Sequence, residues 1–331
     1  YSVILMKVHT LDIDSGERDP VSYPNPSDYV VNLKTPIYNV SKISLISARI
    51  HNSQYLINDR NNTFTINSSS TNYDITIPNG NYDGKDLASN VIVNSNGMLT
   101  TSSYDKDTNA ITFEGPNQFS FDFYNGTNGY KSSVSGRTTP HDVLGLTASN
   151  VFSTSTSPYT LETGSINLQG ADAIIVKLSS GSDDFNKSIF SDLPFYTGRI
   201  LLCGDVINYS GVDDAVEHNF DSGKHKTISK LRVQFYYSSN NRLIPYNFRN
   251  ANHILKLAVT CSTDKFVNIP RLTTEETAEE TMTESLKTPM NILEKEEEDS
   301  HKWDAFISIF LLVSMGIFLL LIIKKPQKVT S

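Results

Sequence analysis

Four residues in the stretch ITIPNGNYDGKDLASN, residues 75–90, have the types and spacing of a calcium-binding loop. Asn79, Asn81 and Asp83 alternate and Gly84 follows directly, like the oxygen ligands and the turn glycine of an EF-hand. The twelfth position of such a loop needs a bidentate glutamate, and here it carries Asn90. We therefore predict no metal ligands in this stretch and expect a corner between a strand and a helix.

The corner has the residues of a structural turn. Asn-Gly and Asp-Gly are strong turn signals because these residues tolerate positive φ, so we expect Gly80 and Gly84 to adopt it. Tyr82 is the side chain we expect to pin the corner to the core. Leu87 and Val91 follow at helical spacing, which predicts a short helix after Gly84.

The cluster DDAVEH, from Asp213 to His218, is the best remaining candidate for a metal or acid–base site. Its glycine-bounded, polar surroundings favour a solvated loop instead. The chain has no P-loop, no G-x-S-x-G and no H-E-x-x-H motif. We predict no catalytic residues, no cofactor, no metal and no small-molecule substrate, and therefore a protein that is not an enzyme.

Cys203 and Cys261 are the only two cysteines, and each lies in an apolar, strand-like run. Two cysteines in 331 residues do not make a disulfide framework. Buried, reduced thiols are the expected state, and a bridge between them is the alternative for a secreted protein.

The elements that carry these residues are predicted to be short β-strands. Asn, Ser and Thr are abundant, Tyr and Phe number 16 each, and period-2 alternation recurs between polar turns. Helical pattern appears only after Gly84 and briefly in TTPHDVLGL, residues 138–146. The predicted fold is mainly β: an antiparallel β-sandwich or jelly roll over 1–270 with one or two short helices. A strand–helix–strand module is expected as an insertion at about 60–150.

The apolar segment 303–323 predicts a single C-terminal transmembrane helix. Its 21 residues would span about 31 Å at 1.5 Å each, which matches a bilayer core. Trp303 suits one interface, and Lys324 and Lys325 end the segment at the other. The predicted anchor residues are Trp303, Phe306, Phe310, Leu311, Leu312, Phe318, Leu319, Leu320, Ile323, Lys324 and Lys325.

Residues 271–302 are predicted to be a flexible linker between the body and the anchor, and 324–331 a short basic tail. The linker holds ten acidic side chains against four basic ones, within a chain of net charge -8. No basic stripe with interleaved aromatics is present, so no nucleic-acid partner is expected. The absence of a signal-like start favours a tail anchor, whereas the lysines after the anchor fit a type I topology.

Several short motifs together resemble minor capsid and penton-like proteins of large nucleocytoplasmic double-stranded DNA viruses. The resemblance begins in DPVSYPNPSDYVVNLKTPIYNVSKISLISARIHNSQYLIN, residues 19–58, and ends in ISKLRVQFYYSSNNRLIPYNFRNANHILKLAV, residues 228–259. Between them lie the turn motif at Ile77–Tyr82, the helix start at Leu87–Ala88, Leu144–Leu146 and the strand lead-in at Asn167–Gly170.

This resemblance implies a jelly-roll capsid protein that links the capsid shell to an internal membrane of the virion. The implied partners are the major capsid protein, other minor capsid proteins and the lipid bilayer. A penton or vertex component is one alternative. A type I cell-surface adhesion or receptor ectodomain is another, and a membrane-tethered hydrolase using Asp213–His218 is a third.

Overall fold

Residues 6–181, 183–186, 193–212, 215–220 and 226–262 are described by the computed structural model of the protein. They form three antiparallel sheets and one α-helix, which confirms the predicted mainly β, antiparallel fold class. The predicted linker 271–302, membrane helix 303–323 and basic tail 324–331 lie outside the described residues and stay predictions. Within the described part of the chain, no helix is long and apolar enough to cross a bilayer.

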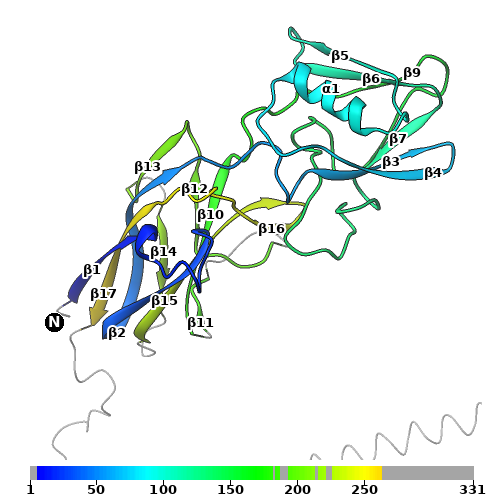
Figure 1. Ribbon diagram of the computed structural model, residues 1–331. Helices are drawn as coiled ribbons and strands as arrows, with labels where there is room; N and C mark the ends of the chain where they lie inside the picture. The colour runs from blue at the N-terminus through cyan, green and yellow to red at the C-terminus, as the bar shows by residue number, and fades with distance from the viewer. Residues whose placement is uncertain (1–5, 182, 187–192, 213–214, 221–225, 263–331) are drawn as a thin grey trace, which may run out of the picture. The chain divides into compact units, whose positions relative to one another are not determined.

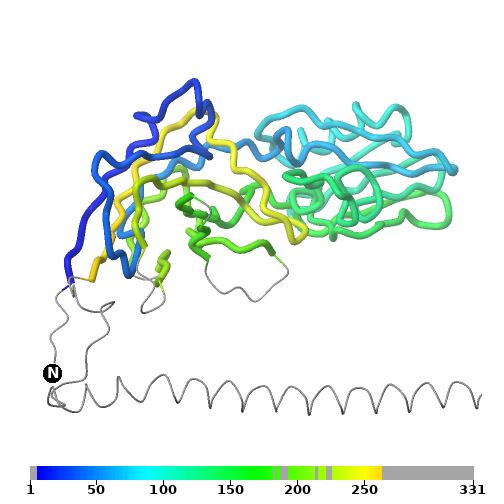
Figure 2. The backbone as a smooth tube through the Cα atoms, turned by 90° about the horizontal axis from the view of Figure 1, so that it is seen from below, coloured from blue at the N-terminus to red at the C-terminus, as the bar shows by residue number. Residues whose placement is uncertain are grey.

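The largest sheet has ten strands and runs in the order β1-β17-β2-β15-β10-β11. β12 also pairs with β10, β13 and β14 with β2, and β16 with β15. Figures 1 and 2 show β1 and β17 side by side, although they come from opposite ends of the described chain. The strands are β1 (Met6–Asp14), β2 (Asp28–His51), β10 (Ala173–Ser180), β11 (Asp183–Asp184), β12 (Gly198–Leu201), β13 (Val206–Ser210), β14 (Val216–Asn219), β15 (Lys226–Ser239), β16 (Arg242–Pro245) and β17 (Ile254–Ser262).

The 24-residue strand β2 organises this sheet because it changes neighbours along its length. Its first half pairs with β15 up to Val40, and its second half pairs with β17 from Val40 to Arg49. Asn39, at φ 55°, lies just before this change of partner. Period-2 alternation in the sequence predicts two separate strands here, 28–34 and 42–54. The structure has one bent strand, because β2 stays paired along its length: with β15 up to Val40 and with β17 from Val40 onward.

Alternating side chains of this sheet form one apolar core. Tyr29, Ile43, Val233, Phe235 and Leu257 are almost fully buried in it, and the whole cluster draws only on residues 13–50 and 174–261. Because inward residues from both halves of β2 belong to the same cluster, the sheet wraps around its core.

The chain between β2 and β10 builds a second core, drawn from residues 56–166. One sheet has the order β4-β3-β7-β8 and another the order β5-β6-β9. Phe64, Phe113, Phe121 and Phe123 are fully buried, with ring centroids 5.1–6.0 Å apart. The elements are β3 (Thr63–Ser68), β4 (Thr71–Thr76), α1 (Gly84–Asn94), β5 (Thr101–Asp105), β6 (Ala110–Gly115), β7 (Phe119–Asp122), β8 (Asn150–Phe152) and β9 (Tyr159–Glu162).

The second helical pattern, at 138–146, forms only one turn. Leu144 N–H donates to the Pro140 carbonyl, and the Leu146 N–H reaches back to the His141 carbonyl at 2.8 Å. Gly145, at φ 63°, ends the turn in the left-handed region. A helix cannot continue past this glycine, so α1 is the one helix of the described residues longer than three residues.

Candidate functional site

The calcium-like oxygens of residues 79–83 hydrogen-bond to the chain itself. Asn79 Oδ1 accepts from Asn62 Nδ2 at 3.1 Å, and Asn81 Oδ1 accepts from Leu56 N–H at 2.9 Å. Asp83 caps α1, because its Oδ1 accepts from the backbone N–H three residues later at 2.8 Å. The stretch therefore makes a strand-to-helix corner whose oxygens close the loop and start the helix.

Gly80, Tyr82 and Gly84 lie in this corner, but the glycines act differently from the prediction. Neither has positive φ, so that expectation is wrong. Gly80 exchanges backbone hydrogen bonds with Ile57 at 2.9 and 3.0 Å. At Gly84 an added Cβ would lie 2.4 Å from the ring of Tyr104, so the position needs glycine for space. Tyr82 is half-buried against the second core and donates its hydroxyl to the Pro78 carbonyl at 2.5 Å.

The proposed Asp213–His218 cluster is described only from residue 215, since Asp213 and Asp214 lie outside the described residues. His218 is on β14, with its ring 5.5 Å from that of Phe185 and 4.7 Å from that of Phe220. Its Nδ1 is 3.0 Å from the Asn186 carbonyl. Among the described residues, no three His, Cys, Asp or Glu side chains are grouped as metal ligands.

A hydroxyl, a carboxylate and an imidazole meet at a place that no sequence motif indicates. Ser239 Oγ donates to Asp142 Oδ2 at 3.5 Å, and His141 Nε2 is 3.1 Å from Asp142 Oδ1. Burial alone would raise the pKa of Asp142, but the hydrogen bond and charge of His141 lower it overall. This arrangement does not activate a nucleophile: in a catalytic triad the hydroxyl contacts the imidazole, whereas here it contacts the carboxylate. Ser239 is instead held by Thr138 Oγ1 at 2.7 Å.

Thr138, Asp142 and Ser239 border a polar groove of about 1020 Å³. Many of its side chains are hydrogen-bonded within the protein: Asn52 Oδ1 accepts from the Tyr246 hydroxyl at 2.8 Å, and Asn167 Oδ1 accepts from two backbone N–H groups. Its lining also includes the carboxylates of Asp172 and Asp205 and one guanidinium, that of Arg199. Most of the amides and hydroxyls that line the groove are hydrogen-bonded within the protein, although the Tyr237 hydroxyl and Arg199 Nε have no hydrogen-bond partner among the described residues, and the groove offers little apolar surface for a ligand.

His253 is the most strongly perturbed histidine of the described residues. It lies among Tyr29, Phe235 and Phe248, and its Nε2 is 3.0 Å from the Tyr29 hydroxyl. Burial, with a smaller effect of the Arg18 charge, lowers its pKa to about 3. A neutral imidazole in an aromatic cage is a packing element of the large core.

The two cysteines are free, and one of them departs from the prediction. Cys261 is buried in β17, and burial raises the pKa of its thiol. Cys203 is exposed, because it lies in the turn between β12 and β13 and not within one continuous strand. The disulfide on which a surface-receptor interpretation would rely is therefore not formed.

Sequence reasoning missed the exposed apolar side chains, which are the strongest candidates for contact with other molecules. More than half of each of these side chains is open to solvent, and they lie on strands, turns and the helix. No periodic pattern in the sequence predicts that these apolar residues are exposed, because exposure depends on which faces the neighbouring elements leave uncovered. They include Met6, Val21, Tyr38, Val93, Phe152 and Val212.

Comparison with solved structures finds nine matching chains, and two of them illustrate how loose the similarity is. The chain superposes on the mavirus penton protein with a TM-score of 0.38 and 11% identity, covering 78% of this chain and 99% of that one. It also matches a chain in the cryo-EM structure of the Sputnik virophage, with a TM-score of 0.25, 11% identity, and 77% and 98% coverage. At this level of similarity neither match assigns a function.

A search of curated proteins finds no match. The model of one protein family, described as a family of unknown function (DUF5901), matches residues 7–246. Since this match covers well over half of the chain, the protein belongs to the DUF5901 family.

Proposed function

We propose that the protein is a structural minor capsid protein whose jelly-roll body joins the capsid shell to an internal membrane. The observation that carries this proposal is the contrast between its polar and apolar groups. The polar clusters at the corner and around Asp142 are closed by internal hydrogen bonds, whereas large apolar side chains such as Val21 and Val212 are left open. Apolar groups at protein surfaces mark contacts with other proteins or lipids.

The capsid class is supported by the motifs that resemble penton-like and minor capsid proteins. Residues 19–58 of that resemblance run through β2, and residues 228–259 run through β15, β16 and the start of β17. These strands are hydrogen-bonded neighbours in the large sheet. The resemblance thus covers the two longest strands of the large sheet, β2 and β15, and the corner motif Ile77–Tyr82 leads into α1.

The tethering role rests on the predicted anchor at 303–323 and linker at 271–302. A flexible linker of this length has a root-mean-square span of about 30 Å, so the body could contact the shell while the anchor stays in the bilayer. The partners in this proposal are the major capsid protein, other minor capsid proteins and lipid. Binding would come from buried apolar surface and shape complementarity.

Localisation in purified virus particles tests the proposal. We expect protease added to intact particles to spare the protein, and detergent to remove lipid while the protein stays with the shell. Cross-linking should then join it to the major capsid protein. The proposal fails if detergent strips the protein from an undisturbed shell and protease digests it on intact particles.

A further inference from the structure

We propose that one end of the large sheet contacts an anionic lipid surface. This basal end is defined as Met6–Val8 of β1, Lys34–Lys42 of β2 and Lys226–Lys230 of β15. The inference rests on the proposed tethering, and it adds which face of the body meets the membrane and which lipid chemistry that face selects.

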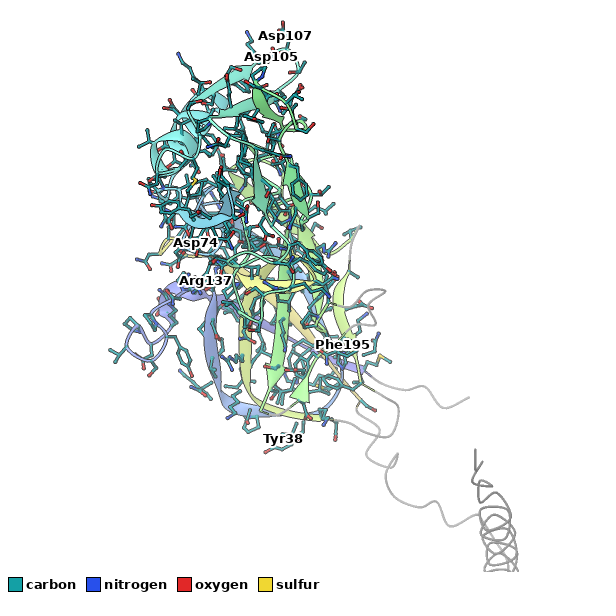
Figure 3. The ribbon with its side chains drawn as sticks, turned by 90° about the vertical axis from the view of Figure 1, so that its right-hand side faces the viewer. Tyr38, Asp74, Asp105, Asp107, Arg137 and Phe195 are labelled. Carbon is teal, nitrogen blue, oxygen red and sulfur yellow. The ribbon has the colours of Figure 1, made fainter. Side chains whose placement is uncertain are left out.

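Strand register brings these three segments to one end of the sheet. Met6 pairs with Ser262, the last described residue of β17, so the chain leaves toward the predicted linker at this end. Cys261 pairs with Val40, and Val40 pairs in turn with Lys226. Figure 1 shows the corresponding ends of β1, β17 and β15 together, and Figure 3 shows Tyr38 projecting at the bend of β2.

Three large apolar side chains stand open at the basal end. Met6 is 63% exposed, Val8 is 58% exposed and Tyr38 is 61% exposed. Met6 and Val8 lie on β1, which begins the strand order of the sheet and pairs with β17 alone among the described strands. Tyrosine is enriched where membranes meet water, because its ring is apolar and its hydroxyl is polar.

The same end carries unpaired positive charge. Lys7, Lys34 and Lys230 are exposed, and none of them takes part in an ion pair within the described residues. Three carboxylates of the described residues near this end are already paired with other lysines, so they do not cancel this charge. These pairs are Lys42–Glu217 at 2.6 Å, Lys226–Asp183 at 2.6 Å and Lys177–Asp184 at 3.0 Å.

The basal end combines exposed lysines with exposed apolar side chains, although the whole chain has a net charge of -8. Lysines attract anionic lipid headgroups and apolar side chains insert among the lipids, so this combination fits an anionic lipid surface. Each lysine near such a surface strengthens binding about fivefold at physiological salt. The predicted anchor would hold the body within about 30 Å of the bilayer, so even a weak contact would be populated.

Lysine acylation of the full chain in vesicles, read by mass spectrometry, tests this inference. Lys7 and Lys34 report on the basal end, and the exposed Lys85 and Lys106 of the second sheet region are internal controls. In phosphatidylcholine–phosphatidylserine vesicles we expect Lys7 and Lys34 to react several-fold more slowly than in phosphatidylcholine vesicles. High salt should restore their rates, and Lys85 and Lys106 should not change.

Two variant pairs separate charge from apolar contact. Lys34→Glu should weaken docking by at least fivefold, so that Lys7 regains most of its reactivity. Lys106→Glu, the same change on the turn after β5, should leave Lys7 protected. Tyr38→Ser should also release Lys7, whereas Val93→Ser, which removes an exposed apolar side chain of α1, should not.

The outcomes distinguish the two proposals. A chain that does not co-float even with phosphatidylcholine vesicles lacks the predicted anchor, and the tethering proposal fails. A chain that co-floats but shows equal Lys7 rates in both vesicle types overturns the basal-end inference alone. Equal protection in both vesicle types, unaffected by salt, would also overturn it, because neighbouring copies would then cover this end.

Discussion

Arg242 is the residue whose removal gives the sharpest test of how the body is held together. Its guanidinium donates to backbone carbonyls of one loop, with Nη2 at 2.8 Å from Gly129 O, 2.8 Å from Tyr130 O and 2.5 Å from Ser132 O. Nη1 is farther from the carbonyl of Arg137, at 3.2 Å. One side chain of β16 therefore holds a loop that starts more than a hundred residues earlier.

We expect Arg242→Met to lower the free energy of unfolding by about 2–4 kcal/mol. Nη2 has two N–H groups, and each charge-assisted hydrogen bond contributes about 1.5–3 kcal/mol. The total is discounted because the released carbonyls can turn toward water. Arg242→Lys keeps the charge but loses the planar fork, so we expect about half of that loss.

Urea unfolding, followed by circular dichroism, measures the change in free energy. Amide hydrogen exchange at Lys131, whose N–H donates to Tyr124 O at 2.9 Å, reports whether the loop opens locally. Arg60→Met is the matched control, because among the described residues its side chain makes a single ion pair, to the adjacent Asp59 at 3.5 Å, and no hydrogen bond to a distant loop. A loss below about 0.5 kcal/mol with unchanged exchange at Lys131 would refute the reasoning.

Three further predictions concern single positions. Gly84→Ala should destabilise the protein by about 1–3 kcal/mol in urea unfolding, because its Cβ would overlap the Tyr104 ring, whereas Gly80→Ala should cost less, because its Cβ would lie 3.4 Å from the Tyr82 ring, at ordinary contact distance. Asp83→Ala should lower the free energy of unfolding by about 1 kcal/mol through loss of the helix cap. Added calcium should change the melting temperature of neither the wild-type protein nor this variant. His253 should make the protein less stable as the pH is lowered: its folded pKa of about 3 lies below the unfolded value of 6.5, so protons bind preferentially to the unfolded chain between these values. From pH 6.5 to pH 5 the loss should be about 2 kcal/mol, and His253→Phe should remove that part of the slope.

Period-2 alternation predicted the strands well wherever one face of a strand is buried and the other is open. In β15, Leu231, Val233, Phe235 and Tyr237 point into the core while their neighbours are more exposed, and the alternating run ISKLRVQFYYSS, residues 228–239, lies within the observed strand. The pattern failed at the bend of β2. Turn-forming residues such as Asn39 look alike in sequence whether the chain reverses or a strand changes partner.

The two corner glycines show a different limit. Sequence reasoning treats glycine as a source of positive φ, but at Gly84 the requirement is room for the Tyr104 ring. Positive φ is instead adopted at asparagines such as Asn96, Asn109 and Asn128. Which of the two roles a glycine has depends on a neighbour 20 residues away, and no local pattern encodes that neighbour.

The abundance of Asn, Thr and Asp explains why ligand-like spacing misleads in this chain. Asp74 accepts hydrogen bonds from the hydroxyls of Thr65 and Thr127, at 2.5 and 2.6 Å, and so joins β4, β3 and the loop after β7. Asp105 accepts from the backbone N–H of Asp107, and this bond contributes most to lowering its pKa. Side-chain oxygens in these loops take the place of missing backbone partners, which long loops between short strands otherwise leave to water. Oxygens committed in this way are poorly placed to bind a metal or substrate, so contact with other molecules falls to the apolar and basic groups that the loops leave open.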